Sequence, residues 1–180
     1  PTIKKLVKTI KYGEALPELN ATVTGLVEGE SIDYTVKREN ESTNAGTYKV
    51  QASGEEYQGS YHVNYVDGLL TINKRSVIMT SASDSKEYNG KALTNKNVIE
   101  TGDGFVDGEG ATYNVTGSQT LVGSSYNTFS YSLNKGTDVN NYDIQVNEGT
   151  LNVTNRKAQY VINVKANSLT AHFVYKFWIL

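Results

Sequence analysis

The strongest constraint on this chain is that its sequence repeats itself. Residues 61–75 (YHVNYVDGLLTINKR) match residues 142–156 (YDIQVNEGTLNVTNR) without a gap, at a constant offset of 81. Upstream of these, residues 25–30 (GLVEGE) match residues 104–109 (GFVDGE) at an offset of 79. Self-similarity with such a period indicates tandem copies of one supersecondary unit, so the fold must be one that can be stacked along the chain.

The repeat predicts three parts: a first copy at residues 1–75, a second copy at 76–156, and a truncated third copy at 157–180. The third is predicted because residues 160–168 (YVINVKANS) resemble residues 77–83 (VIMTSAS). Neither joint contains a run of Pro, Gly or Ser of the kind that makes a flexible linker. We therefore expect the copies to abut closely at a stiff joint, and the strand predicted at 160–164 to lie against the second copy or a neighbouring chain.

Apolar residues alternate with a period of two, which is typical of β-strands. In the first copy Tyr61, Val63 and Tyr65 precede an Asp67-Gly68 pair and Leu70 and Ile72 follow it, and the second copy repeats this order around Glu148-Gly149. An Asp-Gly pair between two alternating runs predicts a β-hairpin at the end of each copy. Further strands are predicted at residues 32–37, 46–52, 76–81, 111–115 and 127–133.

The composition supports the same fold class. The chain has 13 Tyr, 16 Gly and only 2 Pro, and no segment carries a sustained apolar stripe of helical period. We predict a mostly β protein in which each copy is a small sandwich or an open sheet of about five to seven strands. The alternative is a grasp-like α+β unit, which requires a helix at residues 24–31 or 101–110, although their glycines favour a loop.

Several function classes are made improbable by the composition. The absence of cysteine removes disulfides and thiolate metal sites, and two histidines, His62 and His172, are too few for an imidazole metal cluster. The net charge is −2 and no block of like charge is present, so the sequence predicts no basic surface for binding nucleic acid or an anionic membrane. The longest apolar stretch, residues 173–180, is too short to span a bilayer.

The chain resembles a known family in several segments. Tyr12-Gly13 with Pro17, the run at residues 21–30, Gly46-Thr-Tyr48 and residues 67–72 (DGLLTI) are similar to the MBG domain in its YGX variant. The second copy, with residues 86–90 (KEYNG), 116–123, 141–142 and 148–153, resembles the related MBG or YDG-type repeat, with Asn89 where that type has Asp. The resemblance covers residues 8–156. It implies a mostly β repeat that occurs in tandem in bacterial cell-surface, adhesin-like proteins, and hence an extracellular location.

One loop contains candidate metal ligands. Asp103, Asp107 and Glu109 lie in a glycine-rich stretch and carry carboxylate oxygens, the ligand type that Ca²⁺ prefers. The equivalent stretch of the first copy keeps only Glu28 and Glu30, and the spacing lacks the EF-hand ligand set. A solvated turn is the favoured interpretation, and we expect no bound metal and no cofactor.

The tyrosines offer a second candidate site. Sugar-stacking platforms are one interpretation, but positions that alternate along strands favour packing within the sheets. The tyrosines concerned are Tyr34, Tyr48, Tyr57, Tyr61, Tyr65, Tyr113, Tyr126, Tyr131 and Tyr142. No catalytic residue is predicted, since no Gly-x-Ser-x-Gly elbow is present and His62 falls inside an alternating strand. No Lys, Asn and carboxylate trio marks an isopeptide crosslink.

The expected function is structural. We predict a stalk or spacer segment of a bacterial cell-surface, adhesin-like protein, located outside the cell at its surface or wall and with no enzymatic activity. Its expected partners are neighbouring repeats of the same chain. The alternative is a module that binds host glycans or extracellular matrix proteins directly.

Overall fold

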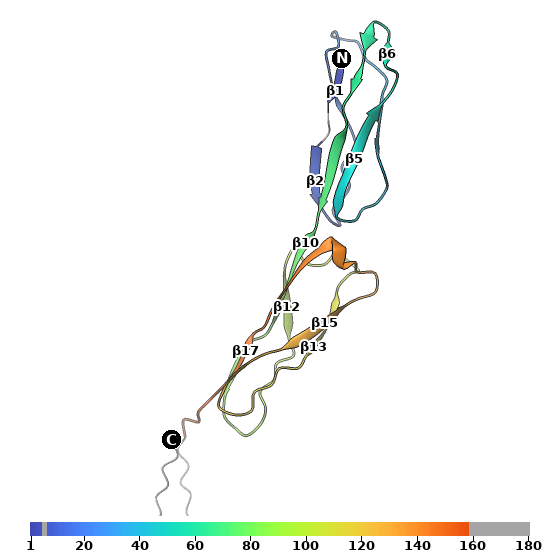
Figure 1. Cartoon of the computed structure of the whole chain (residues 1–180). Helices are drawn as coiled ribbons and strands as arrows, with labels where there is room; N and C mark the ends of the chain where they lie inside the picture. The colour runs from blue at the N-terminus through green and yellow to red at the C-terminus, as the bar shows by residue number, and fades with distance from the viewer. Residues whose placement is uncertain (5–6, 159–180) are drawn as a thin grey trace, which may run out of the picture.

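The computed structural model describes residues 1–4 and 7–158, which form an elongated, all-β body (Figure 1). The N-terminus lies at one tip, and the described chain ends at the opposite tip. Apart from one 3₁₀ turn, η1 (Val139–Asn141), every regular element in this part of the chain is a strand. The mostly β prediction is therefore confirmed. Residues 24–31 and 101–110 hold no helix, so the α+β alternative is wrong.

The strands fall into two groups, which we name the first and the second module. The first module has three sheets, ordered β3-β1-β8, β2-β9-β5-β4 and β6-β7. Its strands are β1 (Thr2–Lys4), β2 (Val7–Lys11), β3 (Thr22–Thr24), β4 (Thr35–Arg38), β5 (Gly46–Ser53), β6 (Tyr57–Gln58), β7 (Tyr61–His62), β8 (Asn64–Tyr65) and β9 (Gly68–Asn73).

The second module also has three sheets, ordered β12-β10-β16, β11-β17-β14 and β13-β15. Its strands are β10 (Arg75–Ser81), β11 (Asp84–Glu87), β12 (Val98–Gly102), β13 (Ala111–Val115), β14 (Gly123–Tyr126), β15 (Phe129–Leu133), β16 (Tyr142–Asn147) and β17 (Thr150–Thr154). Among the described strands, every pairing stays within one module. Strand β10 begins at Arg75, one residue before the predicted boundary.

In each module the first and last parts of the chain run parallel, side by side, along the long axis. In the first module the described partners differ by 62 positions, from Thr2 opposite Asn64 to Lys11 opposite Asn73. In the second they differ by 67, from Arg75 opposite Tyr142 to Glu87 opposite Thr154. Since parallel partners begin at the same end and finish at the same end, the chain enters each module at one end and leaves it at the other.

The predicted hairpins are wrong, and the long strand pairs explain why. Strand β8 pairs with β1, whereas β9 pairs with β2 and β5. The register is constant from β8 through β9, so the chain runs straight past Asp67-Gly68 instead of reversing there. At the corresponding Gly149, a Cβ atom would lie 2.4 Å from the carbonyl oxygen of Ser81. This glycine therefore permits a close backbone approach and does not form a turn.

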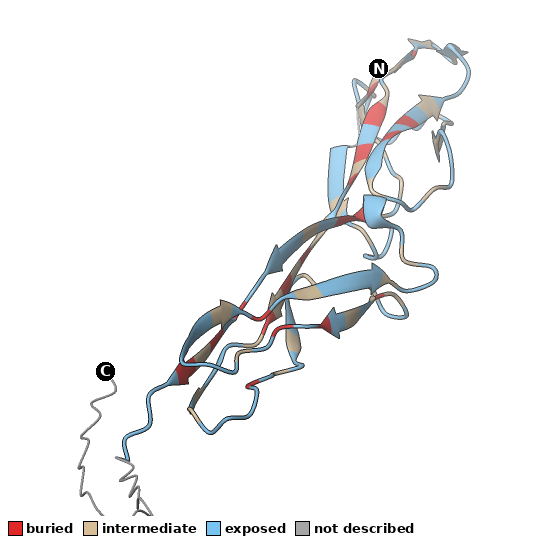
Figure 2. Ribbon diagram, turned by 60° about the horizontal axis from the view of Figure 1, so that its bottom comes forward, coloured by how far each residue is buried: buried red, intermediate tan, exposed pale blue. Residues whose placement is uncertain are grey.

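The core is thin and follows the axis of the body (Figure 2). In the first module its main cluster consists of Tyr48, Val50, Leu70 and Ile72, and Ile3 and Val63 are also buried. In the second it divides into two clusters, one built on Val77, Met79 and Tyr142 and the other on Leu93, Leu151 and Val153.

The remaining strand predictions are confirmed in part. The strand at 111–115 lies where it was predicted, the one at 127–133 begins at Phe129, and the one predicted at 32–37 begins at Thr35 and ends at Arg38. The strand predicted at 160–164, with the truncated third copy that contains it, lies outside the described residues. Within those residues, no helix is long and apolar enough to cross a membrane.

Candidate functional site

The two modules meet through side-chain contacts between residues that are far apart in the sequence. Only Lys74 separates β9 from β10, so the chain passes from one module into the next without a loop. A turn of the first module, residues 11–14, here faces the loop at residues 103–109 of the second. We call this contact region the joint.

Glu109 lies at the centre of the joint and binds one tyrosine from each module. Its Oε1 accepts a hydrogen bond of 2.6 Å from the Tyr12 hydroxyl, and its Oε2 accepts one of 2.6 Å from the Tyr142 hydroxyl. The Tyr142 hydroxyl also accepts a bond of 3.1 Å from the backbone N–H of Val106. One carboxylate thus connects the two modules and the turn that carries it.

The two tyrosine rings also join the hydrophobic cores. Tyr12 packs against the core cluster of the first module and against the Val77 cluster of the second. Its ring meets that of Tyr142 edge-on, with the centroids 5.6 Å apart, and the centroid of the Phe105 ring lies 4.9 Å from that of Tyr142. Edge-to-face pairs of this kind add to the free energy gained by burial alone.

Arg75 holds the backbone on both sides of the joint. Its guanidinium donates hydrogen bonds to the carbonyl oxygens of Gly104 at 2.9 Å, Asp103 at 2.7 Å and Tyr12 at 3.3 Å. Asp103 in turn pairs with Lys11 of the first module, at 2.5 Å between Nζ and Oδ1. The fork of the guanidinium suits several carbonyl groups at once, as a lysine ammonium would not.

Close packing and a second set of hydrogen bonds complete the joint. Gly13 has a φ of +81°, and a Cβ atom there would lie 2.4 Å from a methyl group of Val106. A larger residue would therefore be strained and would push the modules apart. Next to this contact, the amide of Asn141, which is buried, accepts a bond of 2.8 Å from the Ala45 N–H and donates one of 3.1 Å to Asn44.

The joint shifts the acidity of its own side chains. The hydrogen bond to Glu109, together with burial, raises the pKa of Tyr12. Burial and the same carboxylate raise the pKa of Tyr142 to about 12. The hydrogen bond from Lys11 lowers the pKa of the Asp103 carboxyl group. The joint therefore favours the neutral form of both tyrosines.

The three carboxylates considered as calcium ligands, Asp103, Asp107 and Glu109, have different surroundings in the structure. Asp103 binds Lys11 and the backbone N–H of Ser76, Glu109 binds the two tyrosines, and Asp107 lies exposed on the turn between them. In residues 1–4 and 7–158, no group of three or more His, Asp or Glu side chains is placed to hold a metal ion. The loop joins modules, a role that the sequence analysis did not assign to it.

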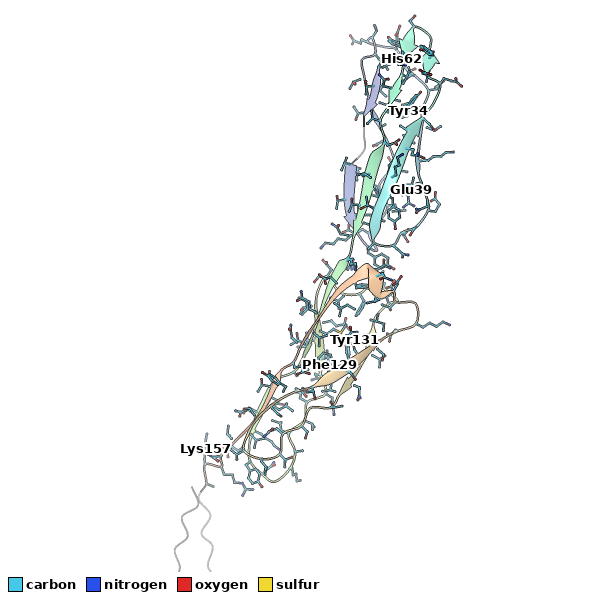
Figure 3. The ribbon with its side chains drawn as sticks, viewed as in Figure 1. Tyr34, Glu39, His62, Phe129, Tyr131 and Lys157 are labelled. Carbon is cyan, nitrogen blue, oxygen red and sulfur yellow. The ribbon has the colours of Figure 1, made fainter. Side chains whose placement is uncertain are left out.

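The candidate tyrosines do not share one surface. Tyr48 and Tyr142 are buried, Tyr34, Tyr61, Tyr65 and Tyr113 are half-buried, and Tyr57, Tyr126 and Tyr131 are exposed on different strands. His62 lies at the tip of the first module (Figure 3), where its ring is 5.1 Å from that of Tyr57 and its Nε2 is 3.1 Å from Glu56.

With the fold and joint described, the chain can be compared with known proteins. Residues 2–71 match the family model of the MBG domain, YGX type. This confirms the resemblance for the first module, and the match runs from β1 almost to the end of β9. No curated protein and no solved structure matches the chain. In the second module the order β12-β10-β16 corresponds to β3-β1-β8 of the first, and in both the middle strand has one antiparallel and one parallel partner.

We expect alkaline pH to weaken the joint. The folded state raises the pKa of Tyr142 from its ordinary value near 10 to about 12, so this contribution to stability is complete below pH ~10 and is lost as the pH rises towards 12. Urea unfolding followed by circular dichroism should show a steeper fall in unfolding free energy above pH ~10 for the unmodified chain than for Tyr142→Phe. A variant at an exposed tyrosine, Tyr126→Phe, should follow the unmodified chain; equal slopes in all three would contradict the expectation.

Proposed function

We propose that this chain is a stalk or spacer segment of a bacterial surface protein and acts outside the cell by holding other domains at a distance. The observation that carries the proposal is the parallel strand pair of each module. Because the chain enters at one end and leaves at the other, copies joined in sequence extend in a line instead of folding back. The resemblance to MBG repeats, which occur in tandem in surface proteins, supports the location. The proposal includes no catalytic step.

The strand pairs also set how much length each module contributes. The first paired residue is Thr2 and the last is Lys11 in the first module, and in the second they are Arg75 and Glu87. At about 3.3 Å per residue, these pairs extend for about 30 Å and about 40 Å. The length of such a rod grows with the number of copies, so the reach of the parent protein would be set by its repeat number.

A spacer is useful only if its joints resist bending. Glu109 and Arg75 bind Tyr12, and Asn141 binds Ala45 and Asn44, so a movement that pulls either of these two parts of the first module away from the second stretches some of these bonds. Interfaces between domains of one chain permit motion by default when they are small. The tyrosine, carboxylate and guanidinium contacts are what set this joint apart from a simple linker.

The proposal predicts a narrow distribution of end-to-end distances. The chain has no cysteine, so spin labels can be attached at Ser60→Cys, in the turn next to His62, and at Lys157→Cys, at the opposite end (Figure 3). Electron–electron double resonance should give one narrow peak. Two glycines inserted between Lys74 and Arg75 should broaden it.

Two outcomes would contradict the spacer function. One is a broad or bimodal distribution in the unmodified chain, or one that the glycine insertion leaves unchanged. The other is specific, saturable binding to a glycan or matrix-protein array by the unmodified chain, which would favour a binding module instead.

A further inference from the structure

The first module carries, at its outer end, the same turn that forms the joint in the second module. In the turn at residues 27–30, the N–H of Glu30 donates to the carbonyl oxygen of Val27 at 3.1 Å, and in the turn at 106–109 the N–H of Glu109 donates to Val106 at 2.9 Å. The glycine before each glutamate has nearly the same φ, +86° at Gly29 and +85° at Gly108. The two turns therefore have the same backbone form.

The side chains on the two turns are arranged alike as well. The Tyr61 hydroxyl donates to Oε2 of Glu30 and accepts a bond of 3.2 Å from the Val27 N–H. The Tyr142 hydroxyl makes the same two bonds, to Oε2 of Glu109 and from the Val106 N–H. We call the group of Val27, Glu30 and Tyr61 the outer socket.

The difference between the two sites is their occupancy. In the second module, Oε1 of Glu109 binds Tyr12, and Val106 is covered by Gly13. In the outer socket, Oε1 of Glu30 accepts no hydrogen bond from any described residue, and Val27 is 64% exposed. The outer socket thus has both the acceptor and the apolar surface that a Tyr-Gly turn covers at the joint.

The opposite tip of the body carries a turn that resembles the one held in the joint. The N–H of Tyr88 donates to Thr154 at 2.9 Å, as that of Tyr12 donates to Asn73 at 2.8 Å. Arg156 donates to the carbonyl oxygen of Tyr88, as Arg75 does to that of Tyr12. Gly90 follows in the left-handed region at a φ of +77°. The described chain therefore presents one half of a joint at each tip.

We propose that the outer socket is a docking site for the Tyr-Gly turn of another repeat of this kind, the turn equivalent to residues 11–14, when that repeat is placed directly before the first module. A tyrosine hydroxyl of that turn donates to Oε1 of Glu30, and the glycine of the turn covers Val27. This deepens the proposed spacer function and rests on it, because it names the partner and the residues that bind it. The loop of the first module has no aspartate in the position of Asp103, so this joint depends on Glu30 more than the known joint depends on Glu109.

The test is a tandem protein in which a copy of residues 1–76 precedes the whole chain. Ile3 faces Tyr65 as Met79 faces Val146, so Ile3 corresponds to Met79 and Pro1 corresponds to Val77. Because Val77 follows Ser76 in the chain, joining the added Ser76 to Pro1 keeps the strand register of the known joint. Spin labels at Lys37→Cys in the added and in the original first module report on the new joint. We expect one narrow distance peak, as across the known joint.

Substitutions of Glu30 at the two positions distinguish a loss of docking at the new joint from a general loss of stability. Glu30→Ala in the original copy, at the new joint, should broaden the peak, and so should Tyr12→Phe in the added copy. The same Glu30→Ala in the added copy, at the free tip, should leave it narrow. Glu28→Ala in the original copy removes an exposed carboxylate two residues away and should also leave it narrow.

The outcomes distinguish this inference from the proposed function. A broad peak across the new joint, or one that Glu30→Ala at that joint leaves unchanged, overturns the docking site. If labels at Ser60→Cys of the original copy and Lys157→Cys still give a narrow peak, the spacer function stands without it. Broad peaks across both joints would overturn both.

Discussion

Replacing Leu151 with alanine is expected to lower the free energy of unfolding by about 3 kcal/mol. Leu151 is fully buried in the central strand of its sheet, opposite Asp84 on one side and Ser125 on the other. The other buried members of its cluster are Leu93 and Val153. Few side chains can therefore move into the cavity that the substitution leaves. Urea unfolding followed by circular dichroism measures the loss.

An exposed position on a neighbouring sheet provides the control. Val146 in β16 is 46% exposed, and Val146→Ala should cost less than ~1 kcal/mol. Leu70 occupies the position of Leu151 in the first module and is equally buried, so Leu70→Ala should cost about as much as Leu151→Ala. Similar small losses for all three variants would show that these leucines are not the core that their burial indicates.

The equivalence of Leu70 and Leu151 was predictable from the sequence alone. Both follow a glycine by two positions in gap-free matching segments, and both are buried in a strand that lies between two partners. Alternation predicted their strands because one face of each strand is buried and the other is exposed. The offset of 81 positions between the copies follows from matching one segment of the sequence with the other. It can therefore be found without knowing which strands pair.

The pairing of those strands was not predictable in the same way. Asp67-Gly68 has the composition of a hairpin turn, and a local rule assigns it to one. One of the two actual partners of β9 is β2, whose residues lie 62 positions earlier in the chain. A long parallel pairing of this kind carries no local signal, because its hydrogen bonds join residues that no short segment contains.

The residues of the joint could be predicted from the sequence only in part, because their contacts also join distant positions. Tyr12 and Arg75 have counterparts in Tyr88 and Arg156, so the repeat marked both as features of every copy. Their contacts with Glu109 and Gly104 span 97 and 29 positions. The three acids of the loop were considered as calcium ligands because nothing in the sequence places tyrosine hydroxyls against them.

Glu109→Ala is expected to loosen the joint more than any other single substitution there. It removes the acceptor of two hydroxyl groups at once and leaves the Tyr142 hydroxyl, which is buried, without an acceptor. An unsatisfied buried donor of this kind costs about 1–3 kcal/mol. Since each 1.4 kcal/mol is about a tenfold change in an equilibrium constant, the bent population should rise by a factor of about ten or more.

The Ser60→Cys and Lys157→Cys label pair measures this as a broader distance distribution. Asp107→Ala is the matched control, because Asp107 lies on the same turn, carries the same charge and is exposed. It should leave the peak narrow. Tyr12→Phe should loosen the joint less than Glu109→Ala, and adding it to Glu109→Ala should have little further effect, because the two groups share one hydrogen bond. Equal broadening by Asp107→Ala and Glu109→Ala would mean that the charge of the turn, and not this hydrogen-bonded pair, keeps the modules aligned.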